Sequence, residues 1–179
     1  MTKIKRPGVP VDNTEFWKNR IAGAPQDENF YVSVFNTSQD VWINILNEHM
    51  KIINELIDTK KDMVLDAGCG YGRMAPYFDN YVGLDFSPDF IDIAKHNYKD
   101  KDFMVGNLKD LPFKDNHFDW SFCISMKRMI VDCTGKEEWN LMETELKRVS
   151  KKVLILEYTD PIEGNPTFAH KYEVVEGDE

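Results

Sequence analysis

The hydrophobic positions of the chain follow two alternating patterns, one typical of buried strands and one typical of helices. Short, continuous apolar runs predict parallel strands that are buried on both faces, at 63–67, 81–85, 103–105, 120–124 and 153–156. Apolar residues recur at helical spacing over about 39–58, in the segment that follows Pro88, and from Trp139 to Val149. This alternation predicts an α/β fold with a doubly wound, mostly parallel sheet, whose ligands bind outside the carboxyl ends of the strands.

Several of the expected helices carry start signals. Thr37 or Ser38 can cap the helix over 39–58, and Ser87 with Pro88 is typical of a helix beginning. Thr134 with Glu137 forms a capping box, which would start the helix that contains Trp139. We also expect short helices over 15–20 and about 73–78.

The remaining segments are harder to interpret. Residues 1–13 predict an irregular arm, and 30–35 is ambiguous between a strand and a buried loop. After strand five only one more strand is expected, at 171–175. We interpret residues 125–129, with residue 132 beyond them, as a loop that follows strand four.

The run VLDAGCGYGR at 64–73 predicts a strand that breaks into a glycine-rich ligand turn. Its G-x-G-x-G spacing differs from the dinucleotide pattern G-x-G-x-x-G, since Arg73 stands where the third glycine would be, and no P-loop string occurs. Asp66 would repel a pyrophosphate but would favour a ligand that carries ammonium and sulfonium charges. The turn therefore favours S-adenosylmethionine as the cofactor.

These motifs carry a family resemblance. VLDAGCGYGR, followed by GLDFSP at 83–88, resembles the first two motifs of the class I, Rossmann-like S-adenosylmethionine-dependent methyltransferases. The resemblance covers roughly 62–158 and implies methyl transfer, with S-adenosylhomocysteine as the product. The family usually completes its sheet with two further strands, so this chain looks abbreviated after the fifth strand.

Candidate cofactor residues follow the predicted strands. Asp85 lies 19 residues after Asp66, the spacing at which a carboxylate reaches both ribose hydroxyls; the alternative is a polar residue that caps the next helix. Phe86 can cover the adenine. The resemblance implies an acidic residue after strand three, but Asn107 stands there, which keeps an acceptor without the charge. The Leu108 backbone amide is a further adenine contact.

The turn itself supplies the other candidates. Gly68 and Gly70 would let the main chain approach the methionine portion and the ribose, and Asp66 can orient the turn. Arg73 can bind the cofactor carboxylate or simply face solvent. The loop after strand four would face the donor methyl and provides Ser125 as a cofactor contact. No catalytic residue is assigned, although that loop also contains Met126, Lys127, Arg128, Met129 and Asp132.

Composition narrows the class of protein. The 179 residues suit one domain, and a net charge of −9 with a pI near 5.0 makes nucleic acid an unlikely partner. Neither a run of 18 apolar residues nor a signal-peptide pattern is present, so we expect no membrane association and a cytoplasmic location. The three cysteines form no C-x-x-C pair, so neither a disulfide framework nor a metal site is expected. The oligomeric state stays open.

The acceptor side is less well specified. The N/D-P-P-Y/F string of DNA amino-methyltransferases and the Pro-Cys pair of cytosine-C5 enzymes are missing, so a small-molecule acceptor is favoured. Residues 1–61 would form an arm and helices that cover the substrate side, and 62–179 the cofactor-binding core, within one structural domain. Trp17, Phe30, Tyr31 and Trp42 would form an aromatic lid or belong to the core, and His49 is better interpreted as a core histidine than as a catalytic one. The alternatives are a protein or RNA methyltransferase and a noncatalytic cofactor-binding subunit.

Overall fold

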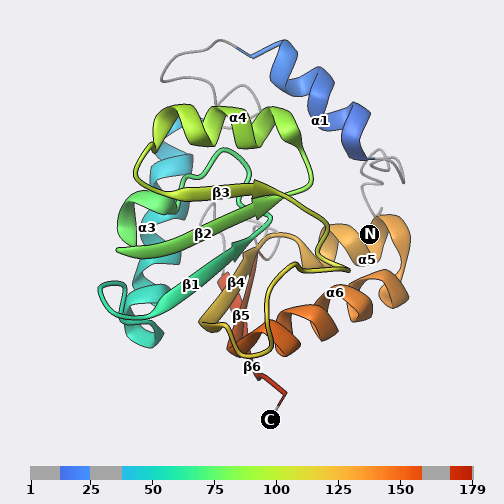
Figure 1. Cartoon of the computed structure of the whole chain (residues 1–179). Helices are drawn as coiled ribbons and strands as arrows, with labels where there is room; N and C mark the ends of the chain where they lie inside the picture. Colours follow the sequence, from blue (N-terminus) through green and yellow to red (C-terminus); the bar gives the residue numbers. More distant parts are fainter. Residues whose placement is uncertain (1–12, 25–37, 159–169, 179) are drawn as a thin grey trace, which may run out of the picture.

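A six-stranded, mostly parallel sheet forms the centre of the molecule (Figure 1). The structure is a computed structural model that describes residues 13–24, 38–158 and 170–178. The strands follow the order β3-β2-β1-β4-β5-β6, and only β6 runs antiparallel to its neighbour. Their bounds are β1 Met63–Ala67, β2 Asn80–Asp85, β3 Asp102–Val105, β4 Phe118–Ile124, β5 Ser150–Tyr158 and β6 His170–Glu176. The expected doubly wound fold is confirmed, and the strand order reverses between β1 and β4, where such sheets bind ligands.

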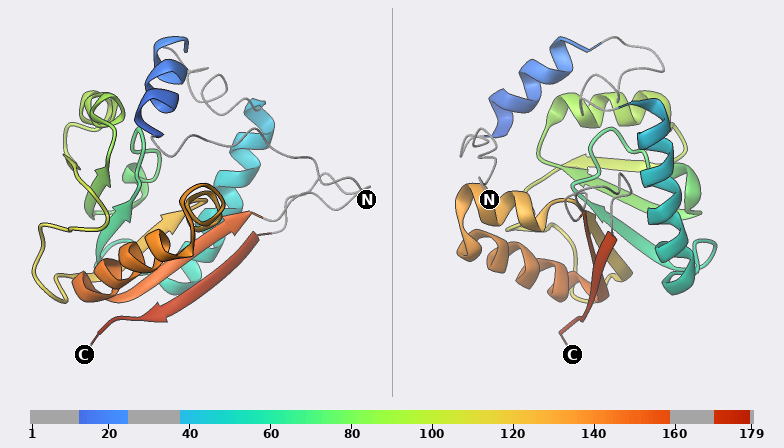
Figure 2. Two further views of the ribbon diagram at one scale, coloured as in Figure 1. Left: turned by 90° about the vertical axis from the view of Figure 1, so that its right-hand side faces the viewer. Right: turned by 180° about the vertical axis from the view of Figure 1, so that it is seen from behind.

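Helices cover both faces of the sheet (Figures 1 and 2). One face packs against α3 (Gln39–Leu56) and α4 (Pro88–Asn97), with Ile53 and Ile91 in the core between them. The other face packs against α5 (Lys127–Thr134) and α6 (Lys136–Val149), which contribute Ile130 and Trp139. The alternate side chains of each strand are therefore buried on opposite faces, which explains why the strands are apolar throughout.

The helix caps confirm two of the expected starts and contradict one. The hydroxyls of Ser38 and Ser87 accept hydrogen bonds from the N–H groups of Val41 and Phe90, both at 3.4 Å. The capping box at Thr134 is wrong: Thr134 ends α5, and its hydroxyl donates to the Ile130 carbonyl at 2.9 Å. Gly135 separates the two helices: α5 ends just before it, and α6 begins just after it.

Other boundaries also differ from the expectation. Residues 127–134 form helix α5 rather than a loop, and the helix expected over 73–78 is only the 3-10 turn η1 (Ala75–Tyr77). Strands β4 and β5 are longer than their apolar runs because parallel pairing extends from Phe118 with Ser150 to Ile124 with Leu156. The strand expected at 171–175 is confirmed as β6.

Helix α1 (Asn13–Ala22) confirms the helix expected over 15–20 and packs over α4. Trp17 lies 5.7 Å from Phe90 between ring centres, and Trp42 is buried in the same cluster. These two tryptophans are therefore core residues between helices. Residues 1–12 of the arm expected over 1–13 lie outside the described residues, as do the ambiguous segment 30–35 with Phe30 and Tyr31, and 159–169; residue 13 begins α1.

The segment between β3 and β4 is fixed by one arginine of α6. The Arg148 guanidinium donates to the carbonyls of Leu111 and Phe113, both at 2.9 Å, and to Asp115 at 2.8 Å. Glu145 binds the same guanidinium and also accepts from the Leu111 N–H. This network orders a chain segment that has no helix or strand of its own.

Candidate cofactor site

The glycine turn is hydrogen-bonded to the end of the neighbouring strand. The N–H groups of Gly68 and Cys69 both donate to the carbonyl of Leu84, at 2.7 and 3.0 Å. The N–H of Gly70 donates to Oδ2 of Asp85 at 2.9 Å. The two segments that the sequence singled out, 64–73 and 83–88, therefore form one structure at the carboxyl edge of the sheet.

The backbone of the turn explains why glycine occurs there. Gly68, Gly70 and Gly72 have φ angles of +79°, +53° and +81°, in the left-handed region that side chains disfavour. A Cβ on Gly68 would lie 2.0 Å from the sulfur of Met126, whereas a Cβ on Gly70 would meet nothing within 4 Å. Gly70 therefore presents bare main chain to open space, as a turn that receives a ligand requires.

Asp85 is the polar centre of this edge. Its two oxygens each accept one backbone hydrogen bond at 2.9 Å, from Gly70 and from Ser87, so each keeps a further lone pair for a ligand hydroxyl. Burial raises the pKa of Asp85, while the backbone N–H groups of Ser87 and Gly70 act in the opposite direction. The next residue, Phe86, is 38% exposed and supplies an apolar ring beside the carboxylate. Asp85 does not itself cap the next helix: it accepts from the Ser87 N–H, and the Ser87 hydroxyl caps α4.

Asp66 lies deeper, in β1. Its side chain is 3% exposed, and Oδ2 accepts a hydrogen bond from the Tyr81 hydroxyl at 2.7 Å. Burial raises the pKa of Asp66 to about 7, against the opposing effects of the Tyr81 hydrogen bond and the Arg73 charge. A carboxyl group with this pKa is available to meet a cationic ligand near neutral pH.

Arg73 does not face solvent. Its guanidinium carbon lies 4.7 Å from the centre of the Trp42 ring, and Nη2 lies 3.3 Å from Nδ1 of His49. His49 is fully buried, in agreement with its interpretation as a core residue. Nη1 of Arg73 is buried and donates no hydrogen bond within the described part of the chain.

Ser125 marks the exit of β4. It has a φ of +60°, its N–H donates to the Leu156 carbonyl at 2.7 Å, and its buried hydroxyl bonds to no other described residue. A non-glycine residue in this conformation is strained, which is common at ligand sites. The side chain of the next residue, Met126, lies against Gly68.

The charged residues of the expected loop lie in helix α5 and take part in ion pairs. Lys127 pairs with Glu173 at 2.8 Å, and Arg128 pairs with Asp132 at 3.7 Å. These interactions engage their charges at the surface. Of the described contacts in the segment that follows β4, those of the Met126 side chain with Gly68 reach the glycine turn.

The two adenine candidates lie in the segment after β3. Oδ1 of Asn107 accepts from the Lys109 N–H at 3.0 Å, and the Leu108 side chain is buried in the core beside Leu84 and Leu111. The oxygen of Asn107 is therefore partly used by its own loop, and one lone pair remains. Their contact with adenine stays a prediction.

Three residues of this region were missed in the sequence as site residues. Tyr81 lies beside Asp66, and Trp42 and His49 lie beside Arg73. Tyr81 lies at the start of an apolar strand. Nothing in its neighbouring sequence indicates that its hydroxyl binds a buried carboxylate on the adjacent strand β1. The α3 residues come from a separate helix, so only tertiary packing brings them to the turn.

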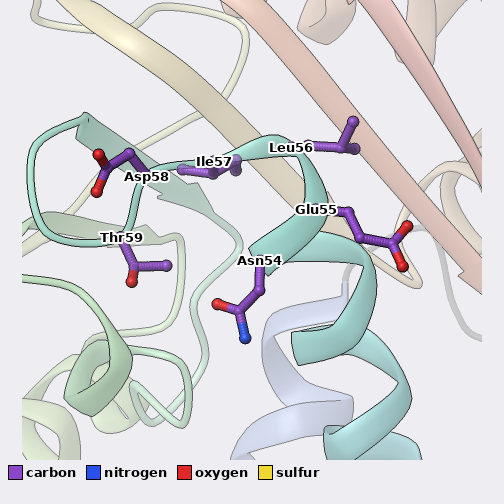
Figure 3. Close-up of a pocket in the computed structure, with 6 residues that line it drawn as sticks. All are labelled: Asn54, Glu55, Leu56, Ile57, Asp58 and Thr59. Atoms are coloured by element: carbon purple, nitrogen blue, oxygen red, sulfur yellow. The ribbon is translucent and has the colours of Figure 1, made fainter.

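A hollow elsewhere on the surface does not coincide with these residues. It has a volume of about 390 Å³ and is lined by Asn54–Thr59, where α3 ends and the chain turns toward β1 (Figure 3). This segment precedes β1 and lies at the amino ends of the strands, whereas the glycine turn lies at their carboxyl ends. We therefore place the functional site at the turn, where the polar groups converge.

Metal ligands and reactive thiols are not gathered at this edge. Among the described residues, no group of three His, Cys, Asp or Glu side chains could hold a metal ion. Cys69 and Cys123 are buried, and burial raises the pKa of both thiols, so both are protonated near neutral pH. No helix in the described ranges is long and apolar enough to cross a membrane.

The fold and the turn together define a Rossmann-like α/β domain with a glycine-rich ligand turn beside its switch point. Residues 65–153 match the family model described as "Methyltransferase domain". Over these residues the chain belongs to the S-adenosylmethionine-dependent methyltransferase family, and its sheet has the Rossmann-like architecture of class I.

Individual relatives cover part of the chain. A demethylmenaquinone methyltransferase of Paenarthrobacter aurescens is 32% identical over 120 residues, which are 63% of this chain and 45% of that protein. An 18S rRNA (guanine-N(7))-methyltransferase of Mus musculus is 29% identical over 80 residues, 42% of this chain and 28% of that protein. The matched part of this chain therefore spans less than half the length of each of these two relatives.

A solved structure shares the fold. Phosphoethanolamine N-methyltransferase 1 of Haemonchus contortus, in complex with phosphoethanolamine and S-adenosylhomocysteine, matches with a TM-score of 0.62 and 18% identity. The match covers 80% of this chain and 31% of that one. At this identity the likeness concerns the architecture of the domain.

Proposed function

We propose that this chain binds S-adenosylmethionine at the glycine turn and transfers its methyl group to a small-molecule acceptor. The observation that carries this proposal is the clamp between Gly70 and Asp85, in which bare main chain with a φ of +53° adjoins a buried carboxylate. This pair suits a nucleoside: the remaining lone pairs of Asp85 accept the ribose hydroxyls, and Gly70 leaves room for the ligand.

Each of the other candidate residues has a matching role. The exposed ring of Phe86 covers the adenine, and Asn107 and the Leu108 amide bind its edge. Asp66 meets the positive charge of the cofactor, and Arg73 its carboxylate. Gly68 and Ser125 border the methionine portion.

The chemistry requires little from the protein beyond this arrangement. When bound, S-adenosylmethionine supplies an activated methyl group for in-line displacement. The residues of this chain hold the reacting groups in line and exclude water, and a general base is needed only for an acceptor that must lose a proton. In this proposal residues 62–179 form the cofactor-binding core, and 1–61 cover the substrate side.

Two features favour a small-molecule acceptor over a nucleic acid. The net charge of −9 opposes binding to a polyanion, and the demethylmenaquinone methyltransferase is named for a small-molecule substrate. The mouse relative is named for RNA, so the acceptor class needs a direct test.

Methyl-labelled cofactor incubated with the protein and a cell extract provides that test. We expect label in the small-molecule fraction, and none when Asp85→Asn, which removes the charge but keeps an acceptor oxygen, replaces the wild type. Label in protein or RNA would contradict the proposed acceptor class. Cofactor binding without label in any fraction would indicate a noncatalytic subunit and contradict the proposed activity.

A further inference from the structure

Two side chains of helix α3 hold the guanidinium of Arg73 beside the glycine turn. Trp42 presents its ring 4.7 Å from the guanidinium carbon, and Nδ1 of His49 lies 3.3 Å from Nη2. Trp42 is 9% exposed and His49 is fully buried, so both belong to the packed part of the helix. The stacked ring and the hydrogen bond together restrain a long side chain that would otherwise sample many rotamers.

The hydrogen bond also defines the state of His49. Arginine has only N–H donors, so Nδ1 of His49 must be the acceptor, and the imidazole is neutral with its proton on Nε2. Toward Arg73, His49 therefore acts as an acceptor that fixes the guanidinium plane.

The other end of the guanidinium has a different environment. Nη1 is buried and donates no hydrogen bond to the residues that the structure describes. The carboxylate of Asp66 is close enough to interact with the Arg73 charge, but its Oδ2 is bound to the Tyr81 hydroxyl. A buried donor without an acceptor is destabilising, and a carboxylate placed against Nη1 would supply the missing acceptor.

We infer that His49 and Trp42 are positioning residues that orient Arg73 toward the carboxylate of the cofactor's amino-acid end. They make the site selective for ligands that carry this end over nucleosides that lack it. The inference rests on the proposed function, because it presupposes that a nucleoside cofactor occupies the glycine turn. The residues that provide this selectivity lie in α3, a helix outside both sequence motifs, 64–73 and 83–88.

Two probe ligands separate this role from a merely structural one. S-adenosylhomocysteine carries the amino-acid end, and 5′-deoxy-5′-methylthioadenosine has the same nucleoside without it. Calorimetric titration should show that His49→Leu weakens S-adenosylhomocysteine about tenfold, the cost of a poorly oriented charged hydrogen bond, and changes methylthioadenosine less than about twofold. Arg73→Met should give the same selective loss.

Two further variants serve as controls. His49→Asn places an amide oxygen near the position of Nδ1, and it should restore most of the affinity for S-adenosylhomocysteine. Ile53→Val removes a buried methyl group from the same helix at a residue that has no polar group to bind Arg73, and it should leave both affinities unchanged.

The outcomes distinguish the two levels of the proposal. If His49→Leu weakens both ligands equally, or neither, the positioning role is wrong while cofactor binding stands. If the wild-type protein binds neither ligand, the proposed function itself is wrong, and the positioning role with it. Retained binding of methylthioadenosine shows that a variant is folded, so a selective loss of S-adenosylhomocysteine supports the inference.

Discussion

At the scale of single residues, the most unusual group is the buried carboxyl of Asp66. Burial raises its pKa from 3.8 to about 7, so the folded state binds this proton more tightly than the unfolded chain does. The stability that it contributes is fully present below about pH 3.8 and is lost as the pH rises through about 7. Above neutral pH, the ionised side chain therefore opposes folding.

Asp66→Asn should stabilise the fold, and by more at pH 8 than at pH 4. The amide oxygen still accepts the Tyr81 hydroxyl, but the cost of burying a charge disappears. We expect a gain of about 1–3 kcal/mol at pH 8, measured by urea unfolding. An equal change at both pH values would show that ionisation of Asp66 does not affect stability.

Gly70→Ala should weaken cofactor binding as well as the fold. The new methyl group would enter open space beside Asp85, and the left-handed backbone costs about 1–2 kcal/mol for alanine. We expect at least about a tenfold rise in the Kd for S-adenosylhomocysteine, the equivalent of about 1.4 kcal/mol.

Gly135→Ala is the matched control. It also has a positive φ, +104°, but it lies between α5 and α6, outside the glycine turn and the Asp85 segment. It should lower the melting temperature and leave the Kd unchanged. If both glycine variants left the Kd unchanged, the ligand would not lie against Gly70.

At the scale of elements, local signals predicted the helices that carry their own caps. Ser38 caps α3, and Ser87 caps α4. Helix α5 was not predicted, because Met126 at its start provides no cap; instead, Glu157 at the end of β5 accepts from the Arg128 N–H at 3.3 Å. A cap that comes from a distant strand leaves no pattern in the neighbouring sequence.

The same distinction applies to the site. The turn and Asp85 follow from motifs within one strand-turn-strand segment, and the sequence predicted both. The contacts of Arg73 with Trp42 and His49, and the position of Met126 against Gly68, arise only when α3 and the β4 exit pack at the sheet edge. These contacts set much of the local geometry and have no local sequence signal.

The segment between β3 and β4 should depend on Arg148. Arg148→Ala removes hydrogen bonds to two carbonyls and two carboxylates. Because the side chain is partly exposed, we expect the free energy of unfolding to fall by about 1–3 kcal/mol. Hydrogen exchange should become faster over 108–116 in particular. Lys147→Ala, which removes a surface pair with Asp178, should change neither measurement appreciably. Unchanged exchange in Arg148→Ala would contradict the role of this network.

At the scale of the whole molecule, the sheet brings separate segments of the chain to one edge. The exits of β1, β2, β3 and β4 provide Gly68, Phe86, Asn107 and Ser125, respectively. Parallel strands have this consequence in general, since all their carboxyl ends lie at the same edge. The order of strands and helices was therefore sufficient to predict the edge at which we propose the cofactor site.

Calorimetric titration of the wild-type protein with S-adenosylhomocysteine shows whether the glycine turn binds the cofactor. We expect saturable binding of one ligand per chain, together with a rise in melting temperature that grows with ligand concentration. Asp85→Asn should lose most of this heat, since the ribose hydroxyls lose their charged acceptor. Absence of both binding heat and a melting shift in the folded wild-type protein would contradict the assignment of the glycine turn as a cofactor site.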